Sequence, residues 1–555
     1  MSMKPQGLEP IPDETRLLVQ RLIPKGTLVT QLRDALGPIY SDEQFAQLFA
    51  KRGRPAEAPW RLALVTVLQA IEGLTDRQAA ECVRTRIDWL DALALPLDDP
   101  GFDYSILSDF RQRLLEAGAD DLILEPILQL CRERGWLKAH GKQRTDATAV
   151  LGRVRALSSL ESVGESMRAA LNVLAKQEPA WLSAQQLPQW QERYVHRFEL
   201  ARFPKAETQR QRLRQQVGED VAHLLSAIDA ESSPESVRLL PAVTLLRQVF
   251  AQHYERDGQQ VRWRDGPAVT NEQRIVSPYD PEARSSRKRD TVWLGYKVHL
   301  TETCDQDPTC PHLITHVETT EATLQDAEVL APIDEHLRAK GLPPAEHYVD
   351  QGYPSGSELV RQRSLGTQII APVGQQTSWQ QREQSGYATG DFAIDWHGQV
   401  ATCPQGQHSV GWTQPLDRRQ QPRVVIRFAE ATCRSCAVRT QCTRGQGGRT
   451  LTLRPPEVHA ALRERRAVQH SPAFVQQYAL RAGIEGTISQ AVRTTRLRRT
   501  PYQGLSKTHL QQVAIAAGLN LKRIAAHVHA HSLGKPTRPA RPKSPFARLQ
   551  NEEVA

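Results

Sequence analysis

Residues 291–302 read "TVWLGYKVHLTE", a run rich in β-branched and aromatic residues that decides the fold class. Together with "HLITHVETTEA" at 312–322, it predicts two paired strands. Four further segments continue the pattern: a strand at 141–154, a helix at 325–341, a strand at 345–356 and a strand at 367–373. Strands interleaved with helices are typical of an α/β core, and the helical segments elsewhere make the chain α+β overall.

The region before this core has the apolar spacing of helices. "PWRLALVTVLQAIEG" at 59–73 stops at a glycine, and Thr75 with Gln78 then has the pattern of a capping box for the next helix. Two helices joined by a short turn are typical of a helix-turn-helix that reads DNA, but also of a plain helical hairpin. The sequence leaves both interpretations open.

Changes in composition predict the domain boundaries. Helical patterns fill 1–140, and again about 155–275, where they interrupt the core as an insertion. The segment 376–455 is polar and holds half of the cysteines, and the Pro- and Arg-rich tail is expected to be disordered. The predicted units are an N-terminal helical domain (1–140), a core (141–375) with its helical insertion, a cysteine-containing insertion (376–455), C-terminal core helices (456–530) and a basic tail (531–555).

The overall composition favours a globular protein with a polyanionic partner. The 555 residues are 39% hydrophobic and 24% charged, with a net charge of +9 and a pI of about 9.2. Nucleic acid is the commonest partner of such a basic chain. We expect neither a secretory signal nor a transmembrane helix, because no apolar run approaches about 18 residues. The eight cysteines are then interpreted as reduced thiols or metal ligands rather than disulfides.

One acidic residue stands out at the start of the most basic region. "YALRAGIEGTISQAVR" at 478–493 is expected to be helical, and Glu485 is its only acid. A run of arginines and lysines follows. Glu485 is interpreted either as a surface salt-bridge partner or as a metal ligand beside residues that bind a phosphate backbone.

Three motifs together carry a resemblance to a known family. "TDAT" contains Asp146, "YVDQGY" contains Asp350, and the spacing Y-x-x-R-x-x-x-E ends at Glu485. From about residue 42 to residue 527, the chain resembles bacterial insertion-sequence transposases of the DDE class, which have a ribonuclease-H-like mixed-sheet core. The resemblance implies that the three carboxylates bind divalent cations, Mg²⁺ or Mn²⁺, two per active site.

The resemblance also implies a reaction and a set of DNA contacts. Such enzymes cleave DNA at the element ends and transfer the strands into double-stranded target DNA, acting as homodimers or higher oligomers in the bacterial cytoplasm near the nucleoid, without membrane attachment. Tyr478, Arg481 and Lys507 are expected to contact phosphates. The family usually has a lysine where this chain has Val492, so the adjacent Arg493 is expected to take that role. A domesticated DNA-binding protein that no longer cuts, and a metal-dependent nuclease without joining activity, remain alternatives.

The cysteine-containing segment predicts a second kind of metal site. Cys433 and Cys436 form a C-x₂-C pair, and Cys442 and Cys403 complete a possible four-thiolate set. Such a set is typical of structural Zn²⁺, and His408 could replace one ligand. The alternative is reduced cysteines without metal.

Overall fold

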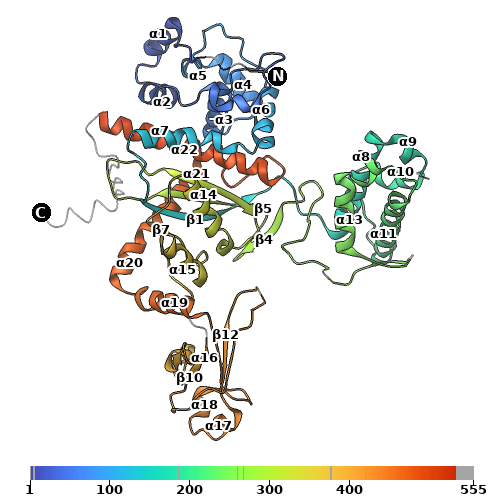
Figure 1. Ribbon diagram of the computed structural model, residues 1–555. Helices are drawn as coiled ribbons and strands as arrows, with labels where there is room; N and C mark the ends of the chain where they lie inside the picture. The colour runs from blue at the N-terminus through green and yellow to red at the C-terminus, as the bar shows by residue number, and fades with distance from the viewer. Residues whose placement is uncertain are drawn as a thin grey trace, which may run out of the picture.

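The computed structural model describes residues 2–3, 5, 7–185, 188–258, 260–266, 268–375, 378–418 and 420–532. A six-stranded sheet lies at its centre (Figure 1). The main strand order is β4-β5-β1-β7-β8, and β6 also pairs with β5. The strands are β1 (Lys142–Leu151), β4 (Arg284–Lys288), β5 (Thr291–Thr303), β6 (Ile314–Glu321), β7 (Glu346–Tyr348) and β8 (Gln368–Ile370).

The sheet is mixed, as a ribonuclease-H-like core requires. Strand β5 runs antiparallel to β4, β6 and β1, whereas β1, β7 and β8 are parallel. Parallel neighbours need crossover connections, and the helices α14 (Leu330–Ala339) and α15 (Gly356–Ser364) supply them. The predicted α/β class and the predicted strands are therefore confirmed.

Helices cover both faces of the sheet. On one face, Thr145 and His347 are hydrogen-bonded, and His347 also contacts Asp334 of α14. Neighbouring residues of a strand point to opposite faces, and Arg144 accordingly contacts the carbonyl of Leu480, beside α21 (Gly483–Thr494). The long helix α22 (Leu505–Ser532) packs on β6 and also contacts the N-terminal helices.

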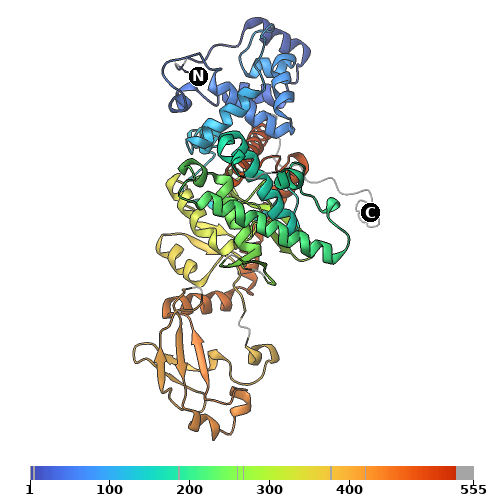
Figure 2. The same ribbon diagram turned by 90° about the vertical axis from the view of Figure 1, so that its right-hand side faces the viewer.

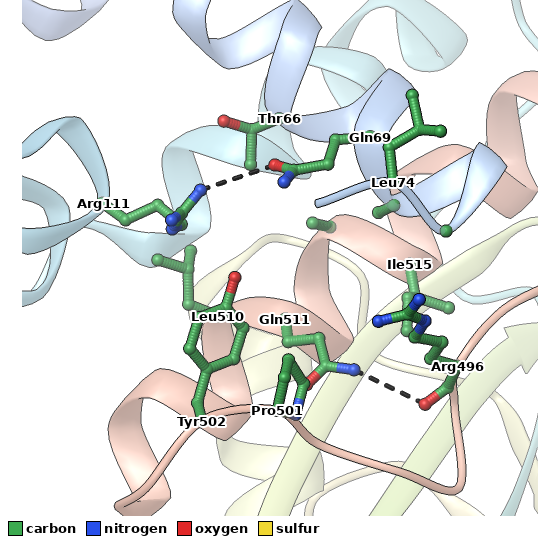
Figure 3. Close-up of a pocket in the computed structure, with 13 residues that line it drawn as sticks. Thr66, Gln69, Leu74, Arg111, Arg496, Pro501, Tyr502, Leu510, Gln511 and Ile515 are labelled. Atoms are coloured by element: carbon green, nitrogen blue, oxygen red, sulfur yellow. Dashed lines mark hydrogen bonds between the residues drawn. The ribbon is translucent and has the colours of Figure 1, made fainter. Parts of the chain in front are cut away.

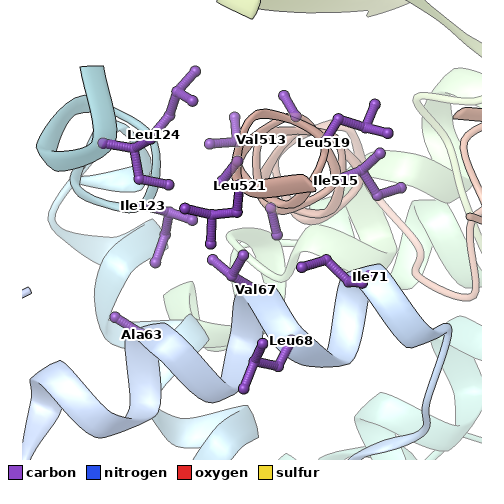
Figure 4. Packing of buried hydrophobic residues seen from close by; sticks show 14 of the residues in the cluster. Ala63, Val67, Leu68, Ile71, Ile123, Leu124, Val513, Ile515, Leu519 and Leu521 are labelled. Atoms are coloured by element: carbon purple, nitrogen blue, oxygen red, sulfur yellow. The ribbon is translucent and has the colours of Figure 1, made fainter. Parts of the chain in front are cut away.

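The N-terminal helices share a hydrophobic core with the sheet domain. Figure 4 shows Val67 and Ile71 of α3 (Pro59–Glu72) against Leu521 and Ile515 of α22. The turn after α3 uses Gly73 in the left-handed conformation, and the predicted capping box of the next helix is present. The remaining helices of this region are α1 (Asp13–Leu22), α2 (Leu28–Leu36), η1 (Asp42–Leu48), α4 (Asp76–Thr85), α5 (Ile87–Ala92), α6 (Ser105–Glu116), η2 (Asp120–Ile123) and α7 (Glu125–Glu133).

A small cavity lies where the N-terminal helices meet the basic loop before α22. Arg111 of α6 donates to Gln69 of α3, and its guanidinium lies 5.6 Å from the centre of the Tyr502 ring. Across the cavity, the side chain of Gln511 donates to the carbonyl of Arg496 (Figure 3). Through these contacts, the loop is held both to the N-terminal helices and to α22.

The predicted helical insertion has a hydrophobic core of its own. It follows β1 and precedes β4, and it projects to one side of the sheet (Figures 1 and 2). A short hairpin that the sequence did not predict closes it. Its elements are α8 (Ser159–Gln177), α9 (Pro179–Ser183), α10 (Pro188–Tyr194), η3 (Leu200–Arg202), α11 (Glu207–Asp229), α12 (Glu235–Arg238), α13 (Pro241–His253), β2 (Tyr254–Asp257) and β3 (Gln260–Trp263).

The cysteine-containing segment is a separate small body at the end of the molecule (Figure 2). Helix α19 (Pro456–Val468) leads from it back to the core and packs on α15. The elements of the cysteine-containing segment are α16 (Trp379–Glu383), η5 (Thr389–Asp391), β9 (Ala393–Asp395), β10 (Val400–Thr402), β11 (Gly411–Thr413), β12 (Val424–Arg427), α17 (Glu430–Arg434), α18 (Arg439–Cys442) and β13 (Thr450–Leu453).

The stretch at 478–493 differs from the single helix expected. Tyr478 ends α20 (Pro472–Tyr478), a 3₁₀ turn η6 (Ala479–Ala482) follows, and α21 then begins at Gly483. The carbonyl of Leu480 accepts a hydrogen bond of 2.7 Å from Arg144, which holds the tight turn in place. The sequence predicts a tail at 531–555, but α22 continues to Ser532, and the rest of the predicted tail lies outside the described residues. No described helix is both long and apolar enough to cross a membrane.

Candidate active site

Asp146 lies on the central strand β1, in register with Leu300 of β5. Its carboxylate accepts from the backbone N–H of Ala147 at 2.8 Å and from Arg481 at 3.4 Å. Burial raises the pKa of Asp146, and the nearby Asp350 carboxylate adds to this rise, while Arg481 opposes it. A carboxylate in such a place gains from any further cation.

The strand register brings Asp350 beside Asp146. Lys142 pairs with Glu346 and Arg144 pairs with Tyr348, so two more residues along the parallel strands lead to Asp146 and Asp350. Neighbouring strands are about 4.8 Å apart. Asp350 follows the end of β7, and its carboxylate accepts from the N–H of Gly352 at 2.8 Å. The two acids therefore occupy the same end of the sheet.

Glu485 is linked to Asp146 through an arginine that contacts both acids. It lies in the first turn of α21, and its side chain is 59% exposed. Arg481 is ion-paired with Glu485 and also contacts Asp146. The guanidinium lies 5.8 Å from the centre of the Tyr478 ring. Tyr478, Arg481, Glu485 and Asp146 are thus brought together although two chain segments supply them.

A fourth acid that sequence reasoning missed lies at the same place. A Cβ added to Gly352 would be 3.0 Å from Asp350 Oδ1 and 3.6 Å from Asp326 Oδ2, so both carboxylates border one small space. Asp326 is paired with Lys297 at 2.7 Å. No motif distinguishes Asp326 in the sequence, because it lies in a short 3₁₀ turn. His299, on the same strand as Lys297, is buried and bonded to Tyr353, as an ordinary structural residue would be.

The predicted phosphate contacts Arg493 and Lys507 are both exposed. Val492 is partly buried and packs against the main hydrophobic core. Two further basic residues lie near Asp146. Arg498 donates to Thr148, two residues along the same strand, and the charge of Lys288 acts on the pKa of Asp146. The sequence feature that could have identified Lys288 and Arg498 is the density of basic residues at 287–289 and 496–499.

A buried ionic network anchors the helix that carries Glu485. Glu302 of β5 is fully buried and accepts from Arg144, Thr487 and Arg523, each at 2.7 Å. Burial alone would raise the pKa of Glu302, but Arg523 and Arg144 outweigh it and lower the pKa. Because α21 supplies Thr487, the network fixes the position of Glu485 relative to β1.

The four cysteines of the predicted zinc site line one small cavity. Cys403, Cys433, Cys436 and Cys442 border it together with His408. Burial raises the pKa of Cys442, and the other three thiols add to the effect, which reflects their proximity. In this part of the described chain, no three sulfurs lie within 4.8 Å of one another. A tetrahedral zinc site with bonds of about 2.3 Å needs sulfurs about 3.8 Å apart. The four thiols would therefore have to move closer together to bind the ion.

Two family models match the chain. One, described as "Transposase DDE domain", matches residues 402–525. The other, described as "Transposase domain (DUF772)", matches residues 18–113. No curated protein matches. The first match begins after Asp146 and Asp350 but includes the four cysteines and Glu485, whereas the second includes α2, α3 and most of α6, three of the helices that pack on α22.

Proposed function

Because the chain belongs to the insertion-sequence transposases of the DDE class, we propose that it cleaves DNA at the ends of an insertion sequence and joins the freed 3′ ends to target DNA. The observation that supports this proposal is that Arg481 contacts both Asp146 and Glu485, while the charge of the nearby Asp350 acts on the pKa of Asp146. These acids come from β1, the end of β7 and α21. Together they leave oxygen ligands at one end of the sheet.

The three carboxylates suit Mg²⁺ or Mn²⁺. Hard oxygen ligands, few in number and open to solvent on one side, match the preference of Mg²⁺ for carboxylates, water and substrate phosphate. Burial raises the pKa of Asp146 and the charge of Asp350 adds to the rise, and a bound cation would offset both effects. Two ions held here would activate the attacking oxygen and stabilise the leaving oxygen of a phosphodiester.

Arg481 has two roles in this proposal. Without a cation, it offsets the charges of Asp146 and Glu485. With the carboxylates otherwise neutralised, its planar guanidinium is available to a phosphate of the element end. Tyr478, whose ring lies beside it, can donate its hydroxyl to a neighbouring phosphate.

The remaining DNA contacts are proposed at exposed basic side chains, two of which lie near Asp146. These residues are Arg493, Lys507, Arg498 and Lys288. Contacts to phosphates fix the position of a duplex without reading its sequence. We propose double-stranded DNA as the substrate and a homodimer or higher oligomer as the active form on DNA.

The zinc proposal concerns the separate cysteine body. Four thiols that share a cavity have the right chemistry for structural Zn²⁺. The ion would stabilise a body with a small core. The catalytic proposal does not depend on it.

The test is incubation of the full chain with labelled element-end DNA and Mg²⁺, followed by separation of cleaved from joined products. Glu485→Gln should reduce both products to background while DNA binding is retained, because the amide loses the charge that holds a hard cation. Glu464→Gln is the matched control, since its side chain is 60% exposed and also ion-paired, with Arg363.

Each other outcome has a definite meaning. Cleavage without joined products would favour the nuclease alternative. DNA binding without either product in the unmodified chain would favour a DNA-binding protein that does not cut. Wild-type cleavage by the Glu485→Gln variant would overturn the role proposed for Glu485.

A further inference from the structure

Three potential metal ligands cluster outside the active site. His316 and Glu318 are two residues apart on β6 and therefore share one face of the strand. His336 faces them from α14. The register Asp146–Leu300–Val317 puts Val317 on the face of Asp146, so its neighbours His316 and Glu318 point to the opposite face. The cluster is therefore separated from the catalytic carboxylates by the sheet.

The two distances from the glutamate to the histidines match those of a tetrahedral metal site. Glu318 Oε2 lies 3.3 Å from His316 Nε2 and 3.4 Å from His336 Nδ1. Ligand atoms about 2.0–2.1 Å from a tetrahedral Zn²⁺ are separated by about 3.3 Å. Both distances exceed the usual range for N–H···O hydrogen bonds, about 2.7–3.2 Å. Among the described residues, this is the only group of three such ligands with all atoms within 4.8 Å of one another.

The surroundings favour a ligand role for these side chains. His316 is 6% exposed, and its Nδ1 has no hydrogen-bond partner within the described chain. In the part of the chain that the structure describes, its Nε2 has only the 3.3 Å contact with Glu318, and a metal bond to Nε2 would be a stronger interaction for this buried ring than that long contact. His336, in contrast, has a side chain 55% exposed, which leaves a route for an ion.

The neighbouring charged groups are already paired. Lys340 is bonded to Asp121 at 2.6 Å. His509 contacts Asp120 with one ring nitrogen and Thr319 with the other. The cluster therefore offers three protein ligands, and a fourth position is left for water.

We propose that His316, Glu318 and His336 bind a Zn²⁺ ion that ties β6 to α14. Two imidazoles and one carboxylate with an open fourth position are a ligand set that zinc accepts. Strand β6 pairs with β5 on the side away from β1, so it forms an edge of the sheet. The ion would fasten this edge to the helix that covers it. The site is independent of the function proposed above.

Metal-free full-length protein, without an affinity tag, is titrated with Co²⁺ as a spectroscopic substitute for Zn²⁺, with Mg²⁺ in excess to occupy the catalytic carboxylates. Co²⁺ at the cysteines gives sulfur-to-metal charge-transfer absorption, whereas Co²⁺ at this cluster gives only d–d bands. The two sites are therefore measured separately. Thermal unfolding with and without Zn²⁺ provides a second readout.

His336→Ala and Glu318→Gln should each weaken Co²⁺ binding at this cluster, measured by the d–d bands that appear without charge transfer, at least tenfold. Each should also remove the part of the Zn²⁺-dependent rise in Tm that this cluster contributes. His531→Ala is the matched control, because this histidine is also exposed and contacts another histidine, His527. It should bind as the unmodified protein does. The proposal is overturned if both cluster variants bind as many ions as the unmodified chain, or if only His531→Ala loses an ion.

Discussion

Gly483 and Gly486, three residues apart in α21, should respond in opposite ways to the same substitution. A Cβ added to Gly483 would overlap the guanidinium of Arg144. That group is 6% exposed and is held by Glu302 and by the carbonyl of Leu480. A Cβ added to Gly486 would meet no atom within 4 Å. Only the first change must therefore displace a buried charge.

The expected magnitudes follow from these contacts. Removing one partner from a buried ion pair costs about 3–5 kcal/mol. The higher helix propensity of alanine returns at most about 1 kcal/mol. Gly483→Ala should therefore destabilise the core by about 2–4 kcal/mol, a fall in Tm of roughly 5–15 °C for a domain of this kind. Gly486→Ala has only the gain in propensity and should raise Tm by up to about 4 °C.

The assay is calorimetric unfolding of the metal-free protein, combined with hydrogen exchange of the amides in 483–494. In Gly483→Ala these amides should exchange faster, whereas amides of α13 in the insertion should not change. Both variants keep a helical backbone, since φ of Gly483 is −63°, so strain of the main chain does not confuse the comparison. A Gly483→Ala protein as stable as the unmodified chain would show that Arg144 does not anchor α21.

Three further outcomes are expected. Arg481→Ala should lower the affinity for element-end DNA and reduce the slope of log K against log salt by about one contact, whereas the exposed Arg363→Ala control should leave both unchanged. Burial lowers the pKa of His253 from 6.5 to about 4, so its contribution to stability is complete above pH 6.5 and about 3 kcal/mol is lost as the pH falls to 4; denaturation of the unmodified protein and His253→Gln at pH 7 and pH 4 measures this loss, and equal losses would contradict it. Elemental analysis of protein purified without chelator should find zinc that Cys436→Ser reduces, and an unchanged zinc content would contradict the cysteine site.

Local patterns predicted the local structure well. The strands at 291–302 and 312–322 and the capping box at Thr75 are set by neighbouring residues, and all are confirmed. The break within 478–493 could not be predicted in this way. It depends on Arg144, which captures a carbonyl more than three hundred positions away in the chain.

The same limit applies to the candidate site. Motifs selected Asp146, Asp350 and Glu485, but no motif selects Asp326, which the fold brings against Gly352. The pairing of β1 with β7 is what puts Asp350 beside Asp146, and the whole insertion separates these strands in the sequence. Contacts of this kind depend on which distant strands pair and in which register, and local propensities and short motifs do not specify that pairing.

The two interpretations of Glu485, surface ion pair and metal ligand, are compatible in this geometry. Its pair with Arg481 is exposed and of the i,i+4 type, and such pairs are worth only about 0.3–0.5 kcal/mol. A cation can therefore displace the arginine at little cost. Asp146 is different, because burial raises the pKa of its carboxyl and Arg481 partly offsets that rise. In the function proposed here, a cation that neutralises both acids would compensate Asp146 for its burial and free Arg481 for phosphate, which would account for a single glutamate at the head of so basic a segment.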